Sequence, residues 1–269
     1  MNNYTEKCQK LTKIIENCTK NDVVIAFSGG VDSALLLKML CNSAKTNGFK
    51  VYAVTINMIL NTVKEISFTK SLAQDFGAIY KIIEINDLDE CGIYENPENR
   101  CYLCKKYMFD KICEFAKSVN ALCVVDGTNY DDLHTHRPGI KALKESGIIS
   151  PLAMAEFTKD EVRRLASEYN ISASNKPSTP CLATRFEYGT KLTPGKIKVV
   201  EMAEEYIKSL GFYNVRVRVH GNLSRIEVDY DDIPDILEKR DEIISKFKDL
   251  GFKYVTVDLQ GFSSGSMDG

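Results

Sequence analysis

Short apolar runs alternate with longer amphipathic stretches along the first two-thirds of the chain. The short runs have the β-branched composition of strands. The expected strands are 22–27, 50–56, 78–84 and 122–126. The longer stretches carry apolar residues three and four positions apart, as helices do. The expected helices are 33–45, 61–76 and 100–118. This alternation predicts an α/β fold with a Rossmann-like, doubly wound parallel sheet.

A change of pattern near residue 190 indicates a second domain. Residues 170–189 are rich in turn formers and have no sustained period, so we interpret them as a long loop, usually a functional feature. Thr193 followed by Pro194 is typical of a helix start. The elements expected beyond it are, in order, a helix, two strands, a helix and a strand: 196–210, 215–220, 224–230, 233–250 and 252–259. We therefore predict a main domain over residues 1–189 and a small α/β domain over residues 190–269.

The strongest local motif follows the first expected strand and opens a helix. It reads Ser28-Gly29-Gly30-Val31-Asp32-Ser33. Glycines let backbone N–H groups approach an anion, hydroxyls add donors, and a helix N-terminus carries partial positive charge. Asp32 would repel a bare phosphate, but a carboxylate suits Mg²⁺ that bridges phosphates. The alternative is an ordinary strand-to-helix turn with a serine cap. The motif is neither Gly-Lys-Ser/Thr nor Gly-x-Gly-x-x-Gly.

A second polar loop is expected where the strand 122–126 ends. It contains Asp126, Thr128 and Asn129. Open parallel sheets bind ligands beyond the carboxyl ends of their strands, so we predict that these side chains contact a ligand. A plain turn would use the same residue types.

Three of the nine cysteines stand out by position. An odd number fits poorly with a disulfide framework, so most should be reduced. Cys101 and Cys104 form a Cys-x-x-Cys pair at an expected helix start, and Cys181 lies in the long loop. No further Cys or His is suitably placed as a fourth zinc ligand, whereas three thiolates suit a [4Fe-4S] cluster with one open iron. Three unrelated thiols, or a metal-free redox pair, are the alternatives.

Charge and hydropathy restrict which binding partners and which cellular compartment we expect. The 35 Lys and Arg residues nearly balance 37 Asp and Glu residues, which removes the overall positive field that nucleic-acid binding usually needs. No run approaches the roughly 18 apolar residues of a membrane span, and residues 1–20 lack the apolar centre of a signal peptide. We expect a cytoplasmic protein without a nucleic-acid or membrane partner.

The hexapeptide at 28–33 resembles the signature of PP-loop ATP-pyrophosphatases, which include GMP synthetase, NAD synthetase, argininosuccinate synthetase and tRNA-thiolating enzymes. That resemblance implies cleavage of ATP between its α- and β-phosphates and transfer of AMP to the substrate. Over nearly the whole chain the resemblance narrows to the LarE sulfur transferases, which help to make the nickel-pincer nucleotide of lactate racemase. The matching motifs are 28–33, Gly-Thr-Asn-x-Asp-Asp at 127–132, Arg137-Pro138-Gly139, Ser150-Pro151-Leu152, 180–185 and Arg216-Val217-Arg218.

Similarity to the LarE family implies a substrate and a sulfur source. The substrate would be pyridinium-3,5-biscarboxylic acid mononucleotide, whose carboxylates are adenylated and become thiocarboxylates. In one branch of the family the cysteine matching Cys181 stands alone and gives up its own sulfur. Another branch has two further cysteines, matching Cys101 and Cys104, and resembles cluster-binding catalysts; this chain looks like that branch. The implied cofactors are ATP, Mg²⁺ and a [4Fe-4S] cluster that receives sulfide from a separate source.

Arginines of the tail complete the expected site. Arg216 and Arg218 lie two apart on an expected strand, so both side chains face the same side. Spacing alone fits a solvated strand face equally well, but the family resemblance implies that their guanidinium groups bind the substrate phosphate. Arg185, four residues after Cys181, is expected to hold the substrate carboxylate or the AMP phosphate. We expect the C-terminal domain to bind substrate and to support a homo-oligomer.

Three other functions share the PP-loop motif. A tRNA-thiolating enzyme often has the same cysteines, but the balanced charge argues against it. An amide ligase such as NAD synthetase would leave the cysteines unused. A nucleotide sensor with a structural metal site would bind ATP without releasing pyrophosphate.

Overall fold

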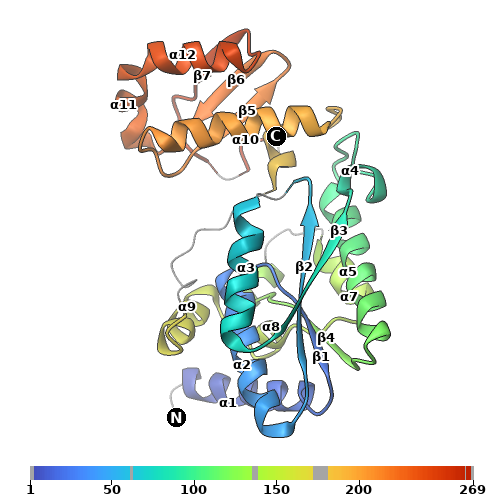
Figure 1. Ribbon diagram of the computed structural model, residues 1–269. Coiled ribbons are helices and arrows are strands. Elements are labelled where there is room, and N and C mark those ends of the chain that lie inside the picture. Colours follow the sequence, from blue (N-terminus) through green and yellow to red (C-terminus); the bar gives the residue numbers. More distant parts are fainter. Residues whose placement is uncertain (1–2, 61–62, 135–138, 172–180, 264, 268–269) are drawn as a thin grey trace. The chain divides into compact units, whose positions relative to one another are not determined.

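The chain forms two compact units (Figure 1). The computed structural model describes residues 3–60, 63–134, 139–171, 181–263 and 265–267. The first unit comprises Met1–Gly92 and Asn99–Thr179, and the second comprises Ile93–Glu98 and Pro180–Gly269. The second unit therefore begins before residue 190, where we placed the domain boundary, and it includes a short segment from the N-terminal half.

Hydrogen bonds explain why the segment 93–98 belongs to the second unit. The Asn96 side-chain amide donates to the carbonyl oxygens of Phe186 at 3.2 Å and Glu187 at 2.9 Å. The backbone N–H of Gly189 donates to the carbonyl of Asn96 at 3.1 Å. Since Asn96 is fully buried, these bonds fix the segment to residues 186–189.

Four parallel strands form the sheet of the first unit, in the order β3-β2-β1-β4. They are β1 (Val23–Ala26), β2 (Val51–Met58), β3 (Ile79–Ile85) and β4 (Cys123–Val125). From β1 the chain adds β2 and β3 on one side and then crosses to β4 on the other, which confirms the predicted Rossmann-like, doubly wound sheet. The direction of winding changes between β1 and β4, where such sheets bind ligands.

Helices cover both faces of this sheet (Figure 1). α2 (Val31–Asn47) and α3 (Val63–Phe76) lie on one face, and α1 (Asn3–Cys18) and α9 (Lys159–Glu168) pack against α2. α5 (Arg100–Ser118) and α7 (Gly139–Glu145) lie on the other face. The short helices are α4 (Asp87–Glu90), α6 (Tyr130–His134) and α8 (Pro151–Met154). Covered on several sides, α2 buries three successive leucines completely: Leu35, Leu36 and Leu37.

The second unit has a three-stranded sheet and its own core. Its sheet has the order β5-β6-β7, with β5 and β6 antiparallel and β6 and β7 parallel. The strands are β5 (Arg216–His220), β6 (Leu223–Glu227) and β7 (Tyr254–Val257). The helices are α10 (Pro194–Ser209), α11 (Ile233–Glu238), α12 (Arg240–Asp249) and the 3₁₀ turns η2 (Leu182–Arg185) and η3 (Tyr230–Asp232). The single helix expected over 233–250 is two helices that meet at Lys239.

Candidate functional site

The phosphate-loop motif lies between β1 and α2, as expected. Gly29 adopts a φ of 74°, in the left-handed region that favours glycine. A Cβ on Gly29 would also lie 2.6 Å from the Cγ2 of Thr69. Both observations favour glycine at this position: the backbone turns tightly here, and it lies close to Thr69 of α3.

The loop presents hydrogen-bond donors at the start of a long helix. Gly30 precedes α2 in an extended conformation, and no side chain caps the first turn, which contains Val31. The Ser33 hydroxyl donates to the Gly30 carbonyl at 3.1 Å and lies 3.3 Å from the Ser28 hydroxyl. Uncapped N–H groups and the helix dipole make this turn suitable for an anion such as pyrophosphate.

Asp32 is held from two sides in the first unit. The Asn129 side-chain amide donates to its Oδ1 at 3.1 Å, and the Lys159 ammonium forms an ion pair with its Oδ2. The Asp32 side chain is 17% exposed, so a cation could reach it. The loop after β1, the loop after β4 and the start of α9 therefore meet at one carboxylate.

Lys159 was missed in the sequence analysis. Thr158 caps α9 by accepting from the backbone N–H of Glu161, whose side chain accepts from the Thr158 N–H. This capping box is visible in the sequence as Thr-x-x-Glu and locates the helix. Nothing local in the sequence indicates that Lys159 contacts a residue 127 positions away.

Asp126 shapes the second polar loop from within the fold. Its carboxylate is buried and accepts hydrogen bonds of 2.5 Å from the hydroxyls of Ser150 and Thr128. Burial raises the pKa of Asp126, and the two hydroxyl hydrogen bonds act in the opposite direction. A Cβ on Gly127 would lie 3.0 Å from the backbone nitrogen of Ser33, so this loop lies directly against the phosphate loop.

Cys101 and Cys104 lie near the start of α5, in the first unit. Cys101 is exposed and Cys104 half-buried, and residues three apart share a helix face. Cys91 forms a thiol hydrogen bond with Cys104, which lowers the pKa of Cys91. Cys181 is exposed and belongs to the second unit. Over the described ranges, no group of three or more His, Cys, Asp or Glu side chains is assembled to hold a metal ion.

Buried ion pairs fix the turn that follows Cys181. The Arg185 guanidinium, 1% exposed, pairs with Glu204 at 2.7 Å and donates to the Thr184 hydroxyl at 2.8 Å. Thr184 in turn donates through its hydroxyl to the carbonyl oxygen of Cys181 at 2.8 Å. Arg218 pairs with Glu227 at 2.9 Å and donates to the Thr184 carbonyl, also at 2.9 Å. A direct contact of Arg185 with substrate would require breaking its pair with Glu204.

Arg216 differs from its two neighbouring arginines. Within the described part of the second unit it has no carboxylate partner; its guanidinium donates to the Val215 carbonyl at 2.7 Å and lies over the Phe262 ring. Burial lowers the pKa of Arg216, and repulsion from Arg185 lowers it further. A half-buried cation of this kind is suited to an anionic ligand.

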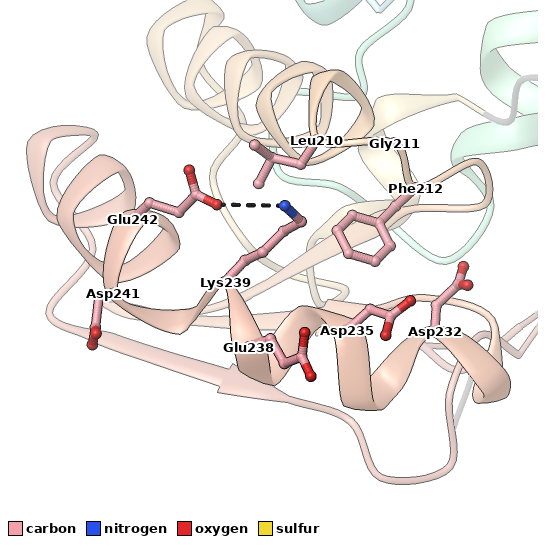
Figure 2. Close-up of a pocket in the computed structure, with 9 residues that line it drawn as sticks. All are labelled: Leu210, Gly211, Phe212, Asp232, Asp235, Glu238, Lys239, Asp241 and Glu242. Atoms are coloured by element: carbon pink, nitrogen blue, oxygen red, sulfur yellow. Dashed lines mark ion pairs between the residues drawn. The ribbon is translucent and has the colours of Figure 1, made fainter.

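A separate pocket of 720 Å³ opens in the second unit between the end of α10 and the helices α11 and α12 (Figure 2). Five acidic side chains and one lysine line it, and that lysine, Lys239, lies 3.8 Å from Glu242. The lining residues are Leu210, Gly211, Phe212, Asp232, Asp235, Glu238, Lys239, Asp241 and Glu242. Its negative charge makes this pocket unsuitable for a phosphate-bearing substrate.

Some of the expected motifs lie outside the described residues. Arg137 and Pro138 of one matching motif, Pro180 of another, and residues 172–180 of the loop expected over 170–189 belong to this group. Along the rest of the chain, no helix is long and apolar enough to cross a membrane.

The fold and the loop at 28–33 define a PP-loop domain protein, and the PP-loop domain family matches residues 3–135. The chain is 39% identical over 246 residues to the pyridinium-3,5-bisthiocarboxylic acid mononucleotide synthase of Lactiplantibacillus plantarum, covering 91% of this chain and 88% of the relative. Uncharacterised proteins of Synechocystis and Methanocaldococcus jannaschii are 37% and 35% identical, over 91% and 97% of this chain and 91% and 99% of the relatives. The chain belongs to the LarE family.

Proposed function

We propose that this protein is an ATP-dependent sulfur transferase that converts the carboxylates of pyridinium-3,5-biscarboxylic acid mononucleotide into thiocarboxylates. The observation that carries the proposal is the arrangement of Asp32, Asn129 and Lys159 at the PP-loop, in a chain 39% identical to a synthase named for that product. Nickel-pincer nucleotide biosynthesis would use the product.

The first unit binds ATP and activates the carboxylate. The uncapped N–H groups of the α2 first turn and the hydroxyls of Ser28 and Ser33 bind the leaving pyrophosphate. The oxygen donors of Asp32 fit Mg²⁺, which would neutralise the developing phosphate charge. Lys159, which pairs with Asp32 here, would contact a phosphate oxygen once a cation occupied that carboxylate. Thr128 and Asn129 position the nucleotide, and Asp126 holds their loop.

In the second unit, Arg216 and Arg218 bind the phosphate of the mononucleotide. Support comes from Arg216, whose half-buried guanidinium donates to the Val215 carbonyl and lies over the Phe262 ring. Arg185 acts indirectly, because its pair with Glu204 fixes Thr184 and with it the backbone of Cys181. This unit would also carry the contacts of a homo-oligomer.

Cys101, Cys104 and Cys181 supply the sulfur site. Their donor chemistry fits a [4Fe-4S] cluster, because none of the three is in a disulfide, two are exposed, and Cys101 and Cys104 share one helix face. Such a cluster, when bound, would keep one iron open for the sulfide that replaces AMP. The chain's own part is to present the three thiolates and to hold Cys181 through the η2 turn.

The reaction is tested with purified protein, MgATP, sulfide and the biscarboxylic acid mononucleotide under anaerobic conditions. We expect pyrophosphate release that requires the mononucleotide, and a product in which sulfur replaces a carboxylate oxygen, identified by mass spectrometry. Pyrophosphate release that requires tRNA or ammonia instead would contradict the proposal in favour of a tRNA-thiolating enzyme or an amide ligase.

The sulfur source is tested by the iron and acid-labile sulfide content of the anaerobically purified protein. We expect about four irons per chain, lost when Cys101, Cys104 or Cys181 is replaced by Ala. Cys41→Ala, a buried thiol within α2, is the matched control and should keep its iron. An iron-free wild type that loses the elements of H₂S from Cys181 after turnover would show a single-use sulfur donor instead.

A further inference from the structure

Three sulfur-bearing side chains lie beside Cys104 in the first unit. The Sγ of Cys104 lies 3.8 Å from the Sδ of Met58, at the end of β2, and 3.8 Å from the Sδ of Met108, one turn further along α5. Cys91, directly after α4, completes the set through its thiol hydrogen bond with Cys104. Three separate parts of the chain thus bring two thiols and two thioethers together.

The spacing suits a single metal ion. A metal–sulfur bond of about 2.3 Å, as in zinc thiolate sites, puts two sulfur ligands of a tetrahedral site about 3.8 Å apart. Both of these sulfur–sulfur distances at Cys104 have this value. Cys104 and Met108 are four residues apart on α5 and therefore share a helix face. Cys104 and its two thioether neighbours therefore already have the separation of ligands on one ion.

The donor types select a soft, monovalent ion. Thiolates and thioethers together favour Cu(I), whereas zinc sites use Cys, His and carboxylate ligands without thioethers. The two carboxylates whose charges act on Cys91 already accept hydrogen bonds. Asp87 accepts from the backbone N–H groups of Ile59 and Leu60, and Glu90 accepts from the Tyr107 hydroxyl at 2.6 Å. Hard oxygen donors are thus engaged elsewhere.

Burial adds a second argument for Cu(I). Cys91 is 7% exposed, and Met58, Cys104 and Met108 are half-buried. A site of this kind shields the ion from bulk water yet remains open to a chelate that delivers it. Binding needs no electron transfer, since Cu(I) replaces the protons of the two thiols.

We propose that Met58, Cys91, Cys104 and Met108 form a Cu(I) site. Cys104 is also one of the three cysteines assigned above to the iron–sulfur cluster. One thiolate cannot serve both metals in these two sites, so Cu(I) and the cluster exclude each other. Copper therefore blocks sulfur transfer by removing Cys104 from the cluster ligands.

The site is tested in metal-free, reduced protein by anaerobic competition with a chromophoric Cu(I) chelator. We expect one Cu(I) per chain, with sulfur ligands only in X-ray absorption spectra. Losing an outer partner of a metal ligand typically weakens affinity about 10–100-fold, so losing a ligand should cost at least about tenfold. That loss is expected for Cys91→Ser, Met58→Leu and Met108→Leu, while Cys101→Ser, which removes the exposed neighbouring thiol, should bind Cu(I) as the wild type does.

Separate control experiments test folding and cluster assembly. Met→Leu changes conserve volume, so circular dichroism and urea unfolding of those variants should match the wild type. Unchanged Cu(I) affinity in the Cys91 and Met variants, or no Cu(I) bound by the wild type, overturns the proposal. Because this titration contains no iron, ATP or substrate, its result does not depend on the sulfur transferase activity. In a second experiment, one equivalent of Cu(I) should prevent iron uptake by the wild type but not by Met108→Leu at a limiting Cu(I) concentration.

Discussion

A single carboxylate joins three loops of the first unit. Asp32 accepts from Asn129 and pairs with Lys159, so its charge is neutralised before any nucleotide arrives. In the proposed function, a cation that replaced Lys159 would free an ammonium group close to the phosphates. At the residue scale, Asp32 would then be both a Mg²⁺ ligand and the anchor of a second phosphate-binding side chain.

Replacing this carboxylate should therefore affect catalysis more than folding. Asp32→Asn keeps the size of the side chain but removes its charge, and we expect pyrophosphate release to fall on the order of a hundredfold or more. The Mg²⁺ concentration for half-maximal rate should rise. Steady-state kinetics across a Mg²⁺ series measures both. Glu114→Gln, which neutralises an exposed carboxylate on α5, should leave both unchanged, and equal effects of the two variants would contradict this role.

The buried carboxylate of Asp126 should make the free energy of unfolding depend on pH. Burial raises its pKa in the folded state, so its contribution to stability is fully present below the unfolded pKa of about 3.9 and is lost as pH rises through the folded pKa. Asp126→Asn does not titrate and should escape that loss. Urea unfolding between pH 4 and 7.5 should show a difference between wild type and variant that changes with pH in the variant's favour. A constant difference would indicate that Asp126 has a normal pKa.

At the scale of single elements, two helix caps of the same kind lie in different units. Thr158 accepts from the N–H of Glu161 at the start of α9, and Thr193 accepts from the N–H of Lys196 at the start of α10. Only the first cap is adjacent to a residue that contacts the PP-loop. Comparing the two caps therefore distinguishes an effect on helix stability from an effect on nucleotide binding.

Thr158→Ala and Thr193→Ala should each lower the free energy of unfolding by about 1 kcal/mol, the usual contribution of such a cap. Thr158→Ala should in addition raise KM for ATP severalfold, because Lys159 is the first residue of the loosened helix. Urea unfolding and ATP-dependent pyrophosphate release measure the two effects. A rise in KM for both variants would point to a general loss of stability instead.

Much of the element pattern was predictable because it is local. The four strands and the helices α2, α3 and α5 of the first unit follow from apolar spacing, and the doubly wound sheet follows from their alternation. The helices α1, α7 and α9 were not predicted. The division of 233–250 into two helices at Lys239 was not predicted, because the apolar spacing alone does not mark an end there. The contact of Lys159 with Asp32 depends on the packing of α9 against α2, which no local pattern encodes. The buried pair of Arg185 with Glu204 depends on packing in the same way.

For the whole molecule, the main departure from the sequence analysis is the route of the chain. The segment Ile93–Glu98 belongs to the second unit although residues on both sides of it belong to the first. The composition of residues 93–98 does not indicate that they belong to the second unit. This becomes apparent only through the buried amide of Asn96 and the carbonyl groups that it binds.

Asn96→Ala should destabilise the second unit. Two carbonyl groups lose their donor, which costs about 1–3 kcal/mol when such groups are buried. Asn96 has a φ of 46°, so the alanine also meets backbone strain; Asn120→Ala, at an exposed position with a φ of 56°, measures that strain alone. Urea unfolding followed by circular dichroism should show a larger loss for Asn96→Ala. Equal losses would mean that the amide contributes nothing beyond its backbone conformation.

The excursion of residues 93–98 also decides what happens when the backbone is cut between residues 179 and 180. The C-terminal fragment would then lack a piece of its own unit, while the N-terminal fragment would still carry that piece, with Asn96 seated against residues 186–189. Nicked protein should therefore elute from a sizing column as one complementing pair. The C-terminal fragment expressed alone should fold only when the segment is supplied.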